Sequence, residues 1–211
     1  SLNEDTGDYE DGTTVLTYQN NKLISVSDDT SGLMTVEYNS ANKISKMVSP
    51  GVLTAEFVYS GTTLSTITTT ITGLSTSVTN YTFLGSKMVK SITTTDYTFL
   101  PIPFKSYTED TYEYQNNTMA KNTTKIGLFD PVSGEVIINP GSVVSVFEYD
   151  TKKNPFTLLP LEYTLFYASI SPQTGFINSR NNPTKSTVTD QDGITKITVA
   201  TNEYDTKDYL T

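Results

Sequence analysis

Hydrophobic and polar residues alternate with a period of two along most of the chain. Within residues 34–38, Met34, Val36 and Tyr38 fall on one side, and the residues between them are polar. Such alternation is typical of a β-strand with one buried face. No 11-residue window shows the sustained i, i+3, i+4, i+7 spacing of an amphipathic helix, and Ala is rare. The pattern predicts an all-β protein.

The alternation is organised into an internal repeat. Each copy has an apolar or aromatic residue, a spacer, a Tyr or Phe, a short polar turn, and then Lys or Thr followed by an aliphatic residue. Five copies follow this pattern closely and two later ones only in part: 16–24, 36–44, 57–64, 81–88 and 112–119, then 147–156 and 202–210. We interpret each copy as a β-hairpin, in which the second aromatic residue ends one strand and the Lys-aliphatic pair begins the next.

Consecutive hairpins predict an antiparallel meander, because each strand then pairs with its neighbour in sequence. Several strands carry apolar residues on both faces, so we expect part of the sheet to be covered or curled. Residues 127–142 contain Asp130-Pro131-Val132-Ser133-Gly134, which is typical of a turn and predicts an additional hairpin.

The chain divides into an acidic N-terminal arm and one β-domain. Residues 1–12 form the arm, and residues 13–211 form the domain. Within the domain, residues 154–183 hold four prolines around an apolar stretch. We expect this insertion to form a loop or a short helix that caps the sheet.

Composition then narrows the chemistry. The 211 residues include no His, Cys or Trp, which excludes imidazole bases, thiolate nucleophiles and zinc-finger sites. The 14 Lys and Arg against 23 Asp and Glu give a net charge of −9, and no basic cluster is present to bind nucleic acid. No apolar run approaches the roughly 18–20 residues of a transmembrane helix.

Carboxylates are the acid–base groups that remain. Neighbouring ones occur at Glu4-Asp5, Asp8, Glu10-Asp11, Asp28-Asp29, Glu109-Asp110, Asp190 with Asp192, and Asp205 with Asp208. A hydrolase that uses such a pair is one hypothesis. We favour the simpler interpretation that these residues form turns and keep loops solvated.

Two further motifs are weak. Asp190-Gln191-Asp192-Gly193 resembles the start of a calcium loop but lacks the third oxygen ligand and the Glu at position 12, so we interpret it as a hairpin turn. Ser40 and Lys43 match Ser-x-x-Lys, but they fall within a predicted turn. We assign no catalytic, cofactor-binding or metal-binding residue, and the sequence identifies no ligand-binding residue.

Aromatic residues outside the repeat are the remaining candidates for recognition. They are Tyr9, Tyr97, Phe99, Phe104, Tyr107, Tyr163, Phe166, Tyr167 and Phe176. If several were exposed on one face, they could stack on sugars or accept a partner strand. We favour a packing role for each of them, with the phenol oxygen at the water edge.

One string resembles a known family. The residues Phe-Glu-Tyr-Asp-Thr-Lys-Lys-Asn-Pro-Phe at 147–156, followed by Asn-Asn-Pro-Thr-Lys at 181–185, resemble secreted lipoproteins of Bacteroidetes that carry degenerate Tyr-Asp-type hairpin repeats. Those domains of unknown function are described as porin-like in fold. The resemblance implies a strongly curled or barrel-like antiparallel meander. It also implies export, a periplasmic or cell-surface location, and a lipid anchor outside these residues. It implies no enzymatic activity.

The sequence therefore predicts a non-catalytic, exported module of the cell envelope without cofactors. We expect it to bind a partner protein, a glycan or another envelope component. The alternative is a carrier that encloses a lipid-like ligand in the curled sheet, with residues 154–183 as its lid.

Overall fold

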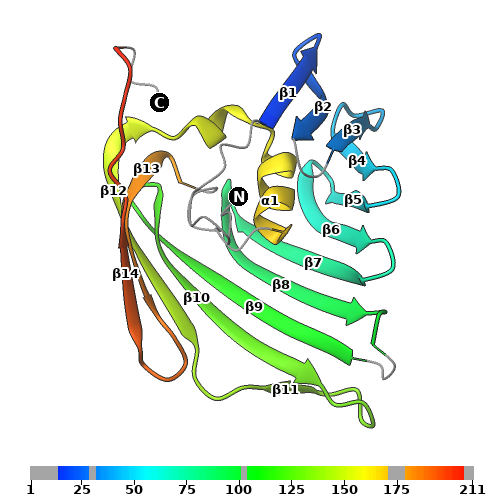
Figure 1. Ribbon diagram of the computed structural model, residues 1–211, viewed down its shortest axis with the longest axis vertical. Helices are drawn as coiled ribbons and strands as arrows, with labels where there is room; N and C mark the ends of the chain where they lie inside the picture. The colour runs from blue at the N-terminus through cyan, green and yellow to red at the C-terminus, as the bar shows by residue number, and fades with distance from the viewer. Residues whose placement is uncertain (1–13, 29–31, 101–103, 171–178, 207–211) are drawn as a thin grey trace, which may run out of the picture.

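The computed structural model describes residues 14–28, 32–100, 104–170 and 179–206. These residues form one antiparallel sheet of 14 strands, in which neighbours along the chain are also neighbours in the sheet as far as β10 (Figure 1). The strands are β1 Thr14–Gln19, β2 Lys22–Asp28, β3 Gly32–Tyr38, β4 Ile44–Ser49, β5 Leu53–Ser60, β6 Thr63–Ile71, β7 Ser75–Leu84, β8 Lys87–Tyr97, β9 Phe104–Gln115, β10 Thr118–Phe129, β11 Val136–Ile138, β12 Val143–Lys153, β13 Asn181–Thr189 and β14 Thr195–Val199. The predicted all-β meander is confirmed.

The last strands depart from a simple meander. The outer edge of β10 is shared, because residues 121–124 pair with β12 and residues 127–129 pair with β11. The additional hairpin expected in 127–142 is therefore present as β10 and β11. The sheet remains open, with β1 and β14 at its two edges, and it is not strongly curled. The expected barrel-like form is not confirmed.

Each of the five close copies of the repeat forms a hairpin with a bulge at the same place. In the first hairpin, Tyr18 pairs with Leu23 while Thr17 pairs with Ser25, so Ile24 is an extra residue on the return strand. The same register shift follows Ile44, Leu64, Met88 and Met119. A bulge of this kind moves the return strand by one residue, so positions i and i+3 face the same side.

The bulge explains which residues enter the core. The first aliphatic residue of every return strand is buried, and the residue three positions later is buried as well. These pairs are Leu23 and Val26, Ile44 and Met47, Leu64 and Ile67, Met88 and Ser91, and Met119 and Asn122. The five hairpins therefore contribute two parallel rows of side chains to one face of the sheet.

Tyrosine hydroxyls link successive hairpins. The Tyr38 hydroxyl donates to the Leu23 carbonyl at 2.9 Å, and Tyr59 donates to the Ile44 carbonyl at 2.6 Å. Tyr114 reaches back in the same way to the Met88 carbonyl at 2.8 Å. Each bond joins the aromatic residue of one hairpin to the first aliphatic residue of the hairpin before it. The repeat therefore encodes contacts between hairpins as well as turns within them.

One α-helix covers the first part of this face (Figure 1). The insertion contains a 3-10 helix, η1 (Pro155–Leu158), and the helix α1 (Leu161–Ile170). Tyr163, Leu165 and Phe166 of α1 are buried in the same core as the two rows of the sheet. Glu162 is also buried, and its carboxylate accepts a hydrogen bond from the Tyr59 hydroxyl at 3.0 Å. The helix is thus fixed by apolar packing and by one buried polar contact.

The string that carries the family resemblance anchors η1 and α1 to the sheet. Asn154 is 2% exposed; its side chain caps η1 through the Phe156 N–H and donates to the Ser179 carbonyl at 3.1 Å. From β13, the side-chain amide of Asn181 donates to the Lys152 carbonyl, and that of Asn182 donates to the Lys153 carbonyl. Residues 147–156 and 181–185, which together carry the resemblance, are therefore joined directly by hydrogen bonds.

The divergent copy 147–156 is not a hairpin, and our interpretation of it is wrong. In copy 147–156, β12 continues to Lys153 and then enters η1, because Asn154 and Pro155 begin a helical turn. In copy 202–210, the Tyr204 hydroxyl donates to the Asp150 carboxylate. Residues 207–210 of that copy lie outside the described residues.

Candidate functional site

The turns of the five hairpins all lie on the side of the sheet where β1, β3, β5, β7 and β9 end. We call this side the repeat rim. It consists of the turns at residues 20–21, 39–43, 61–62, 85–86 and 116–117. Asn20, Asn21, Asn116 and Asn117 all have positive φ angles, as expected for the two-residue turns that match the twist of a hairpin. The rim brings polar turn residues next to η1 and the start of α1.

A pocket of about 500 Å³ opens where the fourth and fifth hairpins meet the insertion, and we call it the rim pocket. Its walls come from four parts of the chain that are distant in sequence. They are Phe83 and Ser86-Lys87-Met88 of the fourth hairpin, Tyr114 and Asn117 of the fifth, Phe156, Thr157, Leu159, Leu161 and Thr164 of the insertion, and Ser179-Arg180 before β13. Pockets of this size are typical of small-molecule sites.

Aromatic and polar groups are mixed in the rim pocket. Phe83, Tyr114 and Phe156 supply rings, and Ser86, Asn117 and Thr157 are among the residues that supply hydroxyl or amide groups. Burial raises the pKa of Tyr114 to about 12, so its hydroxyl stays protonated and donates to Met88. Two cationic residues, Lys87 and Arg180, complete the wall.

Phe83 marks a departure from the repeat at this pocket. At the corresponding position the second, third and fifth hairpins have Tyr, whose hydroxyl binds the hairpin before it. Phe83 has no hydroxyl to reach the Leu64 carbonyl. Its side chain instead lines the rim pocket and a neighbouring pocket of about 210 Å³, whose wall includes Lys43, Tyr59 and Glu162.

Another pocket, of about 400 Å³, lies where the start of β1 meets the insertion. Its wall is mainly apolar and joins the start of β1 to the insertion through Leu16, Phe156, Leu158, Leu159 and Tyr163, with further contributions from Thr14, Pro155 and Tyr167. Phe156 lines both pockets and packs against Tyr167 with ring centroids 6.4 Å apart.

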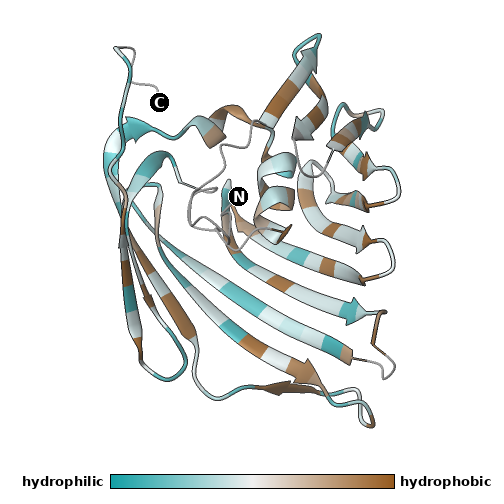
Figure 2. Ribbon diagram, in the orientation of Figure 1, coloured by the Kyte–Doolittle hydropathy of each residue, from teal (hydrophilic) through white to brown (hydrophobic). Residues whose placement is uncertain are grey.

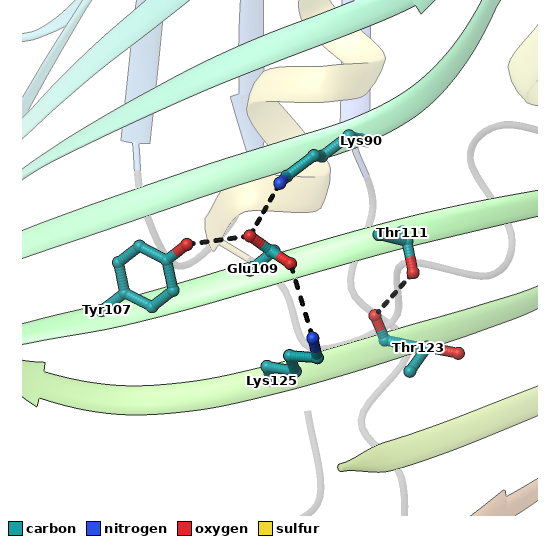
Figure 3. Close-up of polar contacts among 6 residues, drawn as sticks. All are labelled: Lys90, Tyr107, Glu109, Thr111, Thr123 and Lys125. Carbon is teal, nitrogen blue, oxygen red and sulfur yellow. Dashed lines mark hydrogen bonds and ion pairs between the residues drawn. The ribbon is translucent and has the colours of Figure 1, made fainter. Parts of the chain in front are cut away.

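The acidic pair Glu109-Asp110 lies in the middle of β9, so the expectation of a turn is wrong for this pair. Because successive residues of a strand point to opposite faces, the two carboxylates have different surroundings. Figure 3 shows the Glu109 side, where Lys90 lies 2.7 Å and Lys125 4.0 Å from the carboxylate, and Tyr107 donates to it at 2.9 Å. The hydrogen bond from Lys90 is the main reason that the pKa of Glu109 is lowered.

Asp110 lies in a partly buried polar cluster on the face that carries the core. Thr124 donates to its carboxylate at 2.5 Å and the Asn122 amide at 3.3 Å, while burial raises its pKa. Nearby, the hydroxyl groups of Ser91 and Tyr112 lie 3.0 Å apart. The Asn122 side-chain oxygen is buried and has no hydrogen-bond partner among the described residues, so these residues do not fully satisfy the cluster.

The other sequence candidates are not brought together. Asp190 forms the predicted hairpin turn, with its carboxylate accepting the N–H groups of Asp192 and Ile194. Ser40 and Lys43 lie in the turn between β3 and β4. The pairs within residues 1–12, and one member of each of the pairs Asp28-Asp29 and Asp205 with Asp208, lie outside the described residues.

The aromatic candidates differ in exposure, and Tyr97 and Tyr107 are half-buried. Tyr163 and Phe166 are buried, as expected, whereas Phe99, Phe104 and Tyr167 are exposed. The rings of Phe99 and Phe104 lie beside that of Tyr97, at the strand ends opposite the repeat rim. Tyr9 and Phe176 lie outside the described residues. Phe83 and Tyr114 belong to the repeat, so the sequence indicates only that they form hairpins. The structure places both in the wall of the rim pocket.

An exposed apolar area lies at the far end of β10 and on β11, where Figure 2 is brown. Leu128 pairs with Ile137, so both side chains are on one face, and they are 40% and 57% exposed. Ile126 shares that face. In the part of the chain that the structure describes, no helix is long and apolar enough to cross a membrane.

Comparison with known proteins leaves the family open. No protein-family model matches the chain, and no relative is found among curated proteins. The arguments for function therefore rest on the geometry of the site and on the residues that carry the family resemblance.

Proposed function

We propose that this chain is a non-catalytic binding module of the cell envelope that takes a saccharide in the rim pocket. The observation that carries the proposal is the pocket of about 500 Å³, in which three aromatic residues alternate with hydroxyl, amide and cationic groups. Sugars present apolar ring faces as well as hydroxyl groups, and aromatic residues beside hydrogen-bonding groups complement both.

The fixed frame of the pocket supports a binding role. Two hairpins, η1 and the residues before β13 are held in place by backbone pairing, by the Tyr114 hydroxyl and by the buried Asn154. A preformed site loses little conformational freedom when its ligand binds. None of the described residues that line the pocket carries a carboxylate, which disfavours the hypothesis of an acidic-pair hydrolase at this place.

The residues of the family resemblance support the location. Export, a lipid anchor and a place in the bacterial envelope remain proposals that rest on residues 147–156 and 181–185. These residues hold the insertion against the sheet, and Phe156 among them lines the rim pocket. A surface-anchored module would present the repeat rim to extracellular polymers.

The alternative of an apolar carrier is favoured by a different observation. The pocket beside β1 has a volume of about 400 Å³ and a mainly apolar wall. A carrier that encloses its ligand would also need the sheet to curl further toward closure. The helix α1 fills part of that space with Tyr163, Leu165 and Phe166. We therefore prefer the rim pocket as the binding site.

The substitution Ser86→Trp tests the proposal. Ser86 is exposed in the fourth turn and lines the rim pocket, so an indole there would fill the pocket without disturbing the core. Ser40→Trp is the matched control, because Ser40 is exposed in the second turn and lines none of the pockets described above. The chain has no Trp, so each variant also carries a single fluorophore.

The measurement is calorimetric binding of neutral and acidic oligosaccharides of two to four units. We expect at least one of them to bind the wild type and Ser40→Trp, and to bind Ser86→Trp about tenfold or more weakly. The proposal is wrong if no saccharide binds, or if Ser86→Trp binds as well as the control.

A further inference from the structure

The charges of the rim pocket are opposite to those of the whole chain. The protein has a net charge of −9 and a single Arg, Arg180, which lies in the pocket wall together with Lys87. No lining residue of the described part is acidic. A local cationic site in an acidic protein concentrates anionic ligands at one place and repels them elsewhere.

Neither cation forms an ion pair with a carboxylate of the described residues. Six other cationic residues do form ion pairs: Lys46, Lys90, Lys105, Lys121, Lys125 and Lys185. Arg180 and Lys87 take part in none of these pairs. Their positive charges are therefore available to a ligand.

The Lys87 ammonium group and the backbone that carries Arg180 are nevertheless held in place. The Lys87 ammonium group lies 5.4 Å from the centroid of the Tyr114 ring, a favourable cation–π arrangement. The Arg180 backbone carbonyl accepts the Asn154 N–H at 3.0 Å, and the Asn154 side chain binds the preceding Ser179 carbonyl. Because Asn154 is 2% exposed, it acts as a positioning residue for the segment that carries Arg180.

On the basis of the proposed function, we infer that the ligand of the rim pocket is an acidic saccharide whose carboxylate binds Arg180 and Lys87. The planar guanidinium matches a carboxylate with two parallel hydrogen bonds, and the ammonium adds a second charge. Phe83, Tyr114 and Phe156 then face the apolar side of the sugar rings, and Ser86 and Asn117 reach its hydroxyl groups.

The decisive experiment compares trigalacturonate with its methyl ester by calorimetry at low ionic strength. The ester keeps the rings and hydroxyl groups but removes the charge. We expect the acid to bind about tenfold or more tightly than the ester, as charge-assisted hydrogen bonds require. Arg180→Gln and Lys87→Gln should abolish that preference. Lys153→Gln, which removes an exposed cation outside the pocket, should preserve it.

Several results would overturn the inference. Equal binding of acid and ester overturns it, as does an Arg180→Gln variant that binds the acid as tightly as Lys153→Gln. Competition by inorganic phosphate alone as effective as that by trigalacturonate would indicate a general anion site and would also overturn it. If acid and ester bind equally and Ser86→Trp blocks both, the inference fails while the proposed function stands. If Ser86→Trp blocks neither, both fail.

Discussion

The first three hairpins and the last two of the five have the same backbone conformation but place side chains of different polarity on the same face of the sheet. The difference lies in the first residue of the repeat, which pairs with a residue of the return strand. In the first three hairpins both members of this pair are apolar: Leu16 with Val26, Val36 with Met47 and Phe57 with Ile67. In the last two this residue is Tyr and its partner is polar: Tyr81 with Ser91 and Tyr112 with Asn122.

This difference shows how a repeat can be specialised without changing its fold. The bulge and the buried aliphatic residue are kept in all five hairpins, because they set the register and the first row of the core. The second row changes in matched pairs, and the Ser91 hydroxyl lies 3.0 Å from that of Tyr112 in the next hairpin. The apolar part is covered by α1, whereas the polar part adjoins the hairpins that line the rim pocket.

The largest expected effect comes from replacing an apolar residue of the second row by a polar one. Met47→Asn should lower the free energy of unfolding by about 3–5 kcal/mol, because it removes a fully buried side chain and leaves an amide without partners. Urea denaturation followed by circular dichroism measures this loss. Lys46→Asn is the control, because Lys46 precedes Met47 on the same strand and its side chain is 37% exposed. A loss below about 1 kcal/mol for Met47→Asn would contradict the comparison.

A smaller effect is expected in the polar part of the row. Tyr112→Phe removes the hydroxyl that lies 3.0 Å from that of Ser91 and should cost about 1–2 kcal/mol, because the buried Ser91 hydroxyl loses this partner. The same denaturation experiment on Ser91→Ala and on the double variant measures the coupling. Strictly additive losses would show that the two hydroxyl groups do not act as a pair.

Phe83→Tyr should have a smaller effect of the opposite sign. The new hydroxyl would restore the missing link to the Leu64 carbonyl and raise the free energy of unfolding by about 0.5–1 kcal/mol. Thermal unfolding measures the gain, and Phe57→Tyr is the control within the apolar row. A destabilised Phe83→Tyr variant would show that the pocket has no room for the link.

The smallest effects concern pH and the two carboxylates of β9. The pKa of Glu109 is lowered in the folded state, so its contribution to stability is present above its usual pKa and is lost as pH falls through the lowered value. The pKa of Asp110 is raised by burial, so the folded state takes up its proton before the unfolded state, and stability rises as pH falls through the raised value.

Glu109→Gln and Asp110→Asn should therefore change the pH dependence of stability in opposite directions between neutral and acidic pH. Carboxyl carbon resonances in NMR titrations report the two pKa values directly. If Glu109 titrates at or above the usual pKa of a Glu, or Asp110 at or below the usual pKa of an Asp, the difference between the two faces of β9 is refuted.

The sequence predicted the backbone better than it predicted the site. Tyr18, Tyr38 and Tyr59, with the Lys-aliphatic or Thr-aliphatic pairs that follow them, marked the hairpins because turn chemistry and strand alternation are local. The bulges were missed, since an extra residue such as Ile24 breaks the period of two and conceals that Leu23 and Val26 face the same side.

The rim pocket could not be derived from local pattern. It brings Lys87, Asn117, Phe156 and Arg180 together from four segments, and their meeting depends on how the insertion docks on the sheet. The single Arg in an acidic chain was a usable signal. No such signal indicated that Glu109-Asp110 lies inside a strand, because carboxylates are depleted in strands and favour turns in general.

The central claim is that the first hairpins build the frame and the fourth and fifth, with the insertion, build the binding site. The most direct measurement is a map of backbone amide shifts in NMR as trigalacturonate is added. The account predicts large shifts at Ser86, Lys87, Asn117 and Arg180. It predicts none at Asn20 and Asn21, which form the same kind of turn in the first hairpin. Equal shifts at both Asn-Asn turns, or none at Arg180, would contradict it.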